Sequence, residues 1–274
     1  MRRTIALMRR VGQRMTEISG YDRAVALAAH VFTAILPMLL VLDALLPRDA
    51  RRPAGDALAT SLGLSSSAAS AITAALPPSA GTAPEPSGGL TVVGALLLAA
   101  AVFGFARTLQ RTHHAVWGLG PGGARDRAAG ALAAVVLVAE YGLLAWFGPD
   151  LVRPVGSVVL GFVGHAVFAT ALWWVLQWML LAGRVRWRSL LPGSLLTGLA
   201  QSVVVTLSGS YLPFSITGQA ARNGLAGVVI AFLSWQVVLS VLIVTAAVVG
   251  AEVAARDRSQ DADAAHGAES GRPR

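Results

Sequence analysis

Cysteine and lysine are both missing from this 274-residue chain, and charged residues of any kind are scarce. Without cysteine the chain has neither disulfides nor thiolate metal sites, and its redox compartment is not indicated. Charged residues make up 13% of the sequence, against roughly 25% in soluble domains, whereas the apolar class reaches 55%. So few charges do not cover a surface in water. The composition therefore predicts a membrane protein.

Enzyme signatures are also lacking, since the sequence contains no Walker A loop, GxGxxG, GxSxG or HExxH motif. The paired histidines His113 and His114 lie among arginines and raise the alternative of an RNA-processing nuclease. However, metal-dependent phosphodiester cleavage needs several carboxylates, and the 14 acidic residues are scattered, mostly over predicted loops and the tail. We expect a protein that is not an enzyme, with no catalytic residue, no metal and no cofactor.

Six apolar stretches are long enough to cross a bilayer, which takes about 20 residues of helix. The sequence predicts an all-α, polytopic fold with six transmembrane helices at 24–47, 89–106, 128–147, 156–182, 189–209 and 225–250. Together these form a bundle over 24–250. An external loop at 48–88 is expected to carry one or two short amphipathic helices.

The placement of arginine predicts the orientation. With six spans, 17 of the 22 arginines fall on the side of both termini, in the N-terminal arm, the 107–127 loop, the 184–188 turn and the tail. Because positive charge accumulates in cytoplasmic loops, both termini are expected in the cytoplasm of a bacterial inner membrane. The arginine placement then accounts for the net charge of +8 through membrane orientation, and we expect no nucleic-acid partner.

Two segments flank the bundle. Residues 1–23 carry apolar side chains at helical spacing between arginines, which predicts a cytoplasmic amphipathic arm attracted to anionic lipid. Residues 251–274 are small, polar and charged, and are expected to be a disordered cytoplasmic tail. Nothing in the sequence fixes the oligomeric state, and a homo-oligomer is compatible with it.

Polar residues inside the spans are candidates for a polar cavity, because burying them in lipid is costly unless they face the bundle interior. Glu140 and His165 fall at similar depth in adjacent antiparallel spans, and we hypothesise that they pair. Alternatively, each is satisfied separately by backbone, water or another helix. The fifth span places Ser194, Thr197 and Gln201 on one stripe, which either lines a pathway or serves ordinary helix packing. His30 and Gln177 are weaker candidates for the same interior.

The turn RVRWRSLLPG, residues 184–193, gathers three arginines around Trp187. We expect it to be a cytoplasmic anchor with Trp187 at the interface and Pro192 in the first turn of the next helix. Such a helix start is also a candidate phosphate site. The arginines expected to contact anionic headgroups are Arg107, Arg111, Arg184, Arg186 and Arg188.

Five stretches in order resemble the YihY/BrkB family of bacterial inner-membrane proteins. They are FTAILPMLLVL at 32–42, the loop 107–118 ending in Ala-Val-Trp-Gly, RVRWRSLLPG at 184–193, the run 223–235, and Gly-Ala-Glu at 250–252. The chain departs from the family's pattern at His113 and His114, where asparagine is frequent, and at Ala29 and His30, where tyrosines are frequent.

The resemblance spans about 20 to 255 and implies a six-helix inner-membrane protein. The family has carried the label ribonuclease BN, generally regarded as a mistaken assignment. Some members are implicated in moving envelope lipids or solutes. The resemblance therefore implies transport of a lipid or small solute, or another envelope role. A scaffold that holds a protein partner is a further alternative.

Overall fold

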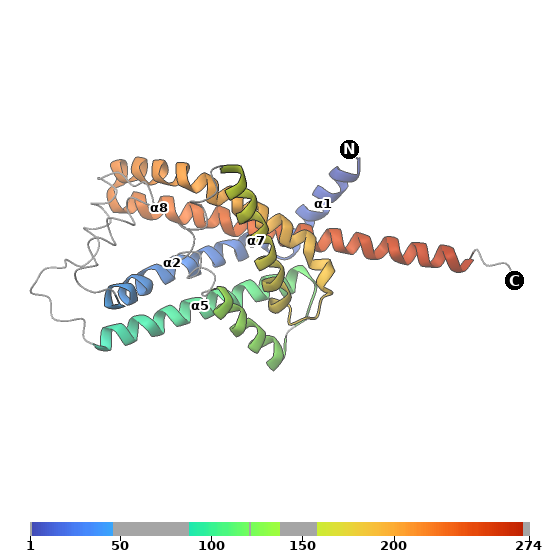
Figure 1. Cartoon of the computed structure of the whole chain (residues 1–274), viewed down its shortest axis with the longest axis horizontal. Helices are drawn as coiled ribbons and strands as arrows, with labels where there is room; N and C mark the ends of the chain where they lie inside the picture. The colour runs from blue at the N-terminus through green and yellow to red at the C-terminus, as the bar shows by residue number, and fades with distance from the viewer. Residues whose placement is uncertain (1, 46–87, 121, 138–157, 271–274) are drawn as a thin grey trace, which may run out of the picture. The chain divides into compact units, whose positions relative to one another are not determined.

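The computed structural model describes residues 2–45, 88–120, 122–137 and 158–270, and every regular element in these ranges is helical. This confirms the predicted all-α class. The helices labelled in Figure 1 are α1 (Arg2–Glu17), α2 (Gly20–Leu45), α5 (Gly88–Val116), α7 (Val158–Leu180) and α8 (Leu191–Ser270). A further helix covers 124–137, and the 3₁₀ turn η1 (Trp187–Leu190) precedes α8. The expected amphipathic helices of the 48–88 loop lie outside the described residues.

Three of the described helices are long and apolar enough to cross a membrane: Val92–Val116, Phe162–Leu180 and Ala226–Asp257. They correspond to the second, fourth and sixth predicted spans. Only 22 to 33% of the residues in their most apolar windows are buried inside the protein. Apolar surface on this scale is rarely exposed to water, whereas lipid tails cover it without cost. A membrane protein is therefore supported, and the six-span count stays a prediction.

The chain forms two compact units. Unit 1 comprises Met1–Ala24, Ala106–Gln201 and Val241–Arg274, and unit 2 comprises Val25–Phe105 and Ser202–Ser240. In unit 2, α2 and α5 run side by side (Figure 1), and His30 of α2 lies over Gly104 of α5. A Cβ atom on Gly104 would come within 2.7 Å of His30 Cδ2. Glycine at this position therefore allows the close approach of the two helices.

Helix α8 consists of two antiparallel arms, because the backbone reverses at Gly224 (φ 56°, ψ −138°), a conformation open to glycine. Within unit 2, Ile216 and Ala220 of the first arm pack with Val228 and Ala231 of the second. Tyr211 stacks on Trp235 with a centroid separation of 5.9 Å. The predicted fifth and sixth spans thus form a helical hairpin, but the connection expected over 210–224 is helical up to Gly224.

One further boundary differs from the sequence prediction, because α8 continues through the expected disordered tail to Ser270. Helix α5 extends past the end of the second predicted span at 106 to Val116. In unit 1, Ala247 and Val248 belong to a buried cluster against which Ala251 packs, and Ala254 is buried as well. The start of the expected tail is therefore stabilised by packing, and its alanines favour helix.

Candidate functional site

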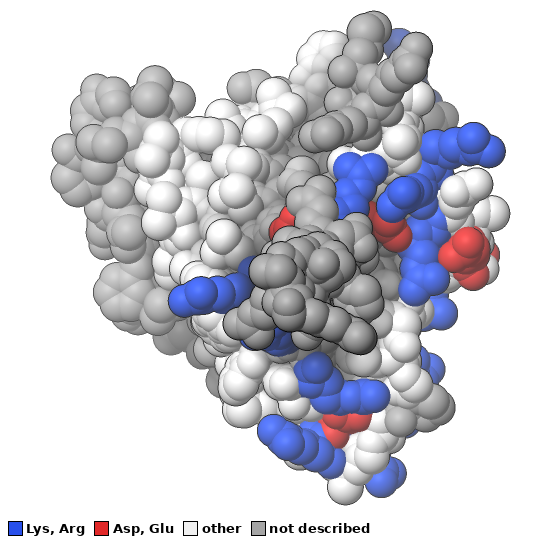
Figure 2. All heavy atoms as spheres, turned by 90° about the vertical axis from the view of Figure 1, so that its right-hand side faces the viewer, with Lys and Arg blue, Asp and Glu red and all other residues white. Residues whose placement is uncertain are grey.

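Arginine is concentrated in unit 1. Of the arginines that the structure describes, all but Arg222 belong to this unit. Figure 2 shows arginine side chains, in blue, outnumbering carboxylates, in red, on the face that it presents. This distribution directs attention to the polar groups of unit 1.

Helix α1 docks in unit 1 through one end of its apolar face. Ile18 is buried with Val116, Ala247 and Val248, and Val11 and Met15 pack against the same cluster. The other end of the face remains uncovered, since Ile5 is 60% exposed and Met8 69% exposed. The predicted amphipathic arm is therefore split into a docked half and a half available to a membrane or partner.

Arg14 of α1 binds the end of α5. Its Nη2 donates to the carbonyl oxygens of Ala115 at 3.3 Å and Val116 at 3.4 Å. The end of a helix carries carbonyls without intrahelical partners and a partial negative charge, so a guanidinium is favourable there. The same side chain donates to Glu17 Oε2 at 3.2 Å.

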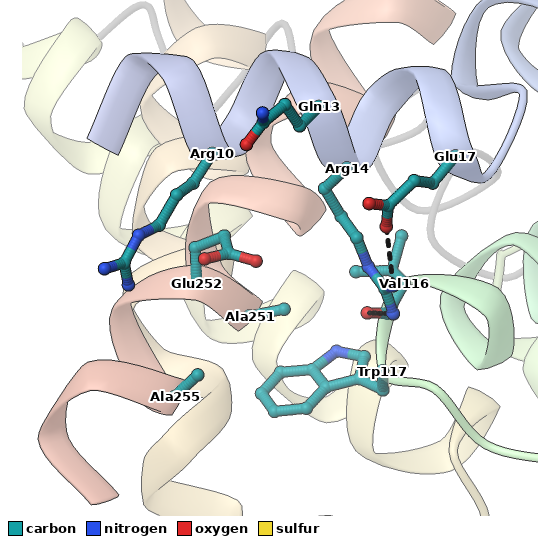
Figure 3. A pocket seen from close by; sticks show the side chains of 9 residues that line it. All are labelled: Arg10, Gln13, Arg14, Glu17, Val116, Trp117, Ala251, Glu252 and Ala255. Atoms are coloured by element: carbon teal, nitrogen blue, oxygen red, sulfur yellow. Dashed lines mark hydrogen bonds and ion pairs between the residues drawn. The ribbon is translucent and has the colours of Figure 1, made fainter. Parts of the chain in front are cut away.

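A pocket of about 340 Å³ lies where α1, the end of α5 and α8 meet in unit 1. Figure 3 shows Arg10 and Arg14 extending from α1, Glu252 pointing from α8 toward α1, and the indole of Trp117 lying beneath. We call this space the α1–α8 pocket. Its lining residues are Arg10, Gln13, Arg14, Glu17, Val116, Trp117, Ala251, Glu252 and Ala255.

This pocket is not evident from the sequence, because Arg10 belongs to the expected amphipathic arm and Glu252 to the expected tail, at opposite ends of the chain. A signal was present, however, because Trp117 and Glu252 come from two of the stretches that carry the family resemblance. A third stretch ends at Gly193, whose backbone contacts that of Gly250. Three of the five family-like stretches therefore meet around α8.

A polar network ties the loops of unit 1 together. Gln110 Nε2 donates to the carbonyl oxygens of Asp126 at 2.7 Å and Leu180 at 3.0 Å. His114 Nε2 lies 3.1 Å from the same Leu180 oxygen. Arg184 Nη1 pairs with Asp126 Oδ2 at 3.3 Å and reaches the carbonyl of Gly120 at 3.4 Å. Arg184, expected to contact lipid, is thus engaged within the protein.

Two buried side-chain nitrogens, His113 Nε2 and Gln177 Nε2, have no hydrogen-bond partner among the described residues. Both side chains are about 1% exposed. His113 uses its other ring nitrogen, Nδ1, with the carbonyl of Leu109 at 3.0 Å. A buried donor or acceptor without a partner costs about 1–3 kcal/mol, so the amide of Gln177 and the Nε2 atom of His113 destabilise the described packing.

We expect Gln177→Leu to raise the melting temperature of the detergent-purified protein, because leucine of similar size removes an unpartnered donor. Each kcal/mol gained corresponds to roughly 2–4 °C in a chain of this size class. The control is Gln110→Leu, which should lower the melting temperature because two carbonyl oxygens lose their donor. Intrinsic tryptophan fluorescence during heating measures both. A lower value for Gln177→Leu would mean that its amide has a partner.

In the predicted polar stripe on α8, the hydroxyl groups of Ser194 and Thr197 donate hydrogen bonds to backbone carbonyls four residues earlier in the chain. Ser194 Oγ donates to the carbonyl of Leu190 at 2.9 Å, and Thr197 Oγ1 donates to that of Gly193 at 2.8 Å. Both side chains are buried. Gln201 Oε1 accepts a hydrogen bond from Trp173 Nε1 of α7. These bonds are those expected of close helix packing, and the alternative role of the stripe in a pathway stays a prediction.

The remaining predicted interior residues are not brought together in one described site. Glu140 lies outside the described residues, so its pairing with His165 stays a hypothesis. His165 is partly buried in α7. His30 belongs to unit 2, where its Nδ1 lies 2.7 Å from the carbonyl of Ala26. Gln177 lies in unit 1 beside Gly193.

The arginine turn contains a tryptophan cluster. Trp187 lies 4.7 Å from Trp174 and 5.6 Å from Trp178, measured between ring centroids. Trp174 Nε1 also donates to the carbonyl of Trp187 at 2.8 Å. Pro192 falls in the first turn of α8, as predicted. Among the arginines proposed to contact lipid, those with exposed side chains and no described partner are Arg107, Arg111, Arg186 and Arg188.

Comparison with known proteins agrees with the resemblance found in the sequence. The family model described as virulence factor BrkB matches residues 11–270, nearly the whole chain. No curated protein and no solved structure matches the chain. The matched range includes every helix around the α1–α8 pocket except the first turns of α1. With the matched range covering nearly all of the sequence, the chain belongs to the virulence factor BrkB family.

Proposed function

We propose that this chain is a six-span protein of the bacterial cytoplasmic membrane, with both termini in the cytoplasm, that translocates a membrane lipid or a small solute without enzymatic chemistry. The observation that carries the proposal is that all described arginines except Arg222 belong to unit 1, which also contains the α1–α8 pocket. Arginines at one end of a membrane protein attract anionic headgroups. Polar groups beside them offer a place for a headgroup or solute.

The burial of the histidine pair argues against the nuclease alternative. His113 and His114 are both buried, and each has a ring nitrogen within hydrogen-bond distance of a backbone carbonyl. A general acid or base must come within hydrogen-bond reach of the substrate. An RNA strand would have no access to these rings without rearrangement of α5.

A scaffold for a protein partner is a second candidate, supported by exposed Ile5 and Met8 on α1. The same helix carries Arg9 and Arg10, whose charge favours an anionic lipid surface. Covalent crosslinking from position 8 in membranes separates the two, because a discrete protein adduct supports a scaffold and lipid adducts alone support membrane contact.

Reconstituted vesicles provide the test of translocation. With fluorescently tagged phosphatidylethanolamine and phosphatidylglycerol in both leaflets, dithionite should bleach a larger fraction when the protein is present than in empty vesicles. The combined variant Arg107→Ala, Arg111→Ala, Arg186→Ala, Arg188→Ala should slow translocation several-fold, since it removes four exposed arginines that are proposed to attract headgroups. The matched control is Arg222→Ala in unit 2. Equal bleaching with and without protein would contradict lipid translocation.

A further inference from the structure

The α1–α8 pocket has the size of a polar headgroup site. Its volume of about 340 Å³ falls at the lower end of the range for small-ligand pockets, roughly 300–1,000 Å³. Its walls come from three segments distant in sequence, α1, the end of α5 and α8, and all belong to unit 1. The chemistry of the lining then determines what it would hold.

The pocket carries two arginines and two glutamates, of which only one pair is engaged. Arg14 and Glu17 bind each other, and Arg14 also binds the backbone at the end of α5. Arg10 and Glu252 make no ion pair with each other or with another described residue, although Figure 3 shows both on the walls of the pocket. The pocket therefore offers one available cation and one available anion.

An aromatic face completes the lining. Figure 3 shows the indole of Trp117 below the carboxylate of Glu252 and beside the guanidinium of Arg14. An ammonium group near Glu252 would meet both a carboxylate and an indole, and cations are attracted to indole faces. A phosphate near Arg10 would meet an arginine fork with its preferred geometry. A purely anionic ligand would instead face the unpaired Glu252, and a purely cationic ligand the unpaired Arg10.

We propose that the α1–α8 pocket binds a zwitterionic phosphoethanolamine group, with its phosphate at Arg10 and its ammonium between Glu252 and Trp117. Membrane lipid is one source of this group, and a free glycerophosphodiester is another. The exposed Ile5 and Met8 on the same helix favour the lipid, since they would hold α1 at the headgroup layer. This inference deepens the proposed function, on which its membrane placement rests, by naming the class of headgroup.

Native mass spectrometry of the full-length protein in detergent tests the inference without requiring translocation. Offered equal amounts of phosphatidylethanolamine and phosphatidylglycerol, the protein should retain the former. Glu252→Gln leaves the pocket with surplus positive charge, so the preference should invert in favour of phosphatidylglycerol. Arg10→Gln should weaken retention of phosphatidylethanolamine about tenfold, the loss expected for one charge-assisted hydrogen bond.

A matched control for Glu252→Gln lies on the same helix. Asp257→Asn on α8 changes an exposed charge outside the pocket and should retain the wild-type preference. A change of fold would alter retention of both lipids together, so the inversion by Glu252→Gln separates recognition from stability. Titration calorimetry with soluble glycerophosphoethanolamine identifies the source of the group. Tight binding of this soluble probe would indicate a free ligand, whereas no binding of the probe would indicate the membrane lipid.

Two outcomes overturn the inference: the wild type prefers phosphatidylglycerol, or Glu252→Gln keeps the wild-type preference. Either result together with normal lipid translocation would leave the proposed function standing. Conversely, Glu252→Gln could invert the lipid preference as expected while the wild-type protein moves no lipid in vesicles. That result would support the headgroup site and contradict lipid translocation.

Discussion

Gly250→Leu is expected to abolish recovery of monodisperse protein, and Gly250→Ala to lower the melting temperature by many degrees. A Cβ atom on Gly250 would lie 2.6 Å from the backbone nitrogen of Gly193 and also against its Cα atom. Real Cβ contacts are essentially never shorter than 3.0 Å. Because the obstructing atoms belong to backbone, no side chain can rotate away, and the two arms of α8 must separate.

The expected loss is large for a single methyl group. Overpacking a close-packed interior costs typically 1–3 kcal/mol, occasionally more, and a backbone obstruction belongs at the upper end of that range. Size-exclusion profiles and tryptophan fluorescence on heating measure the effect. The larger leucine side chain adds further overlap, so loss of folded protein is expected rather than a shifted transition.

Two other glycines provide internal controls. A Cβ atom on Gly193 would lie 3.4 Å from Gln177 Oε1 and 3.5 Å from Gly250 Cα, which are ordinary contacts. Gly193→Ala should therefore cost little, although Gly193 faces the same contact as Gly250. Gly164 of α7 has nothing within 4 Å of its Cβ position, and Gly164→Ala should be neutral or slightly stabilising because alanine favours helix. Equal sensitivity at Gly193 and Gly250 would show that the described crossing is wrong.

Periodicity and length predicted the helices because these are local properties of the chain. The apolar runs at 89–106, 156–182 and 225–250 each correspond to a described helix that can cross a membrane. Helix ends were less predictable. The second predicted span ends at 106, whereas α5 continues to Val116, and Leu109, Thr112 and Val116 of this extension are buried in unit 1.

The candidate site was less predictable than the fold because it depends on contacts between distant segments. The sequence predicts a cationic cytoplasmic side, which stays a prediction, and the described arginines other than Arg222 belong to unit 1. It did not indicate that Arg10 and Glu252 face one pocket, since nothing local relates the first helix to the end of the last. Likewise, Gly250 belongs to a stretch that resembles the family, but the sequence does not show that Gly250 packs against Gly193, because the two glycines are far apart in the chain.

Single-cysteine labelling should give an all-or-none reading of the topology, because the natural chain contains no cysteine and any introduced thiol is unique. Gly120 and Gly218 are exposed with nothing near their Cβ positions, and Arg186 is also exposed. In intact cells a membrane-impermeant maleimide should label Gly218→Cys. It should label Gly120→Cys and Arg186→Cys only after the membrane is permeabilised.

The three positions together test two predicted spans, the third and the fifth, which are not among the three candidate spans of the described residues. If Gly120→Cys and Arg186→Cys share a side, the chain crosses the membrane an even number of times between them. If α7, a candidate span, is one of these crossings, the segment that begins with the helix at 124–137 must supply another. Opposite labelling of Arg186→Cys and Gly218→Cys requires a crossing by the first arm of α8. Labelling of Gly120→Cys from outside would reverse the proposed orientation, and with it the proposed cytoplasmic placement of both termini.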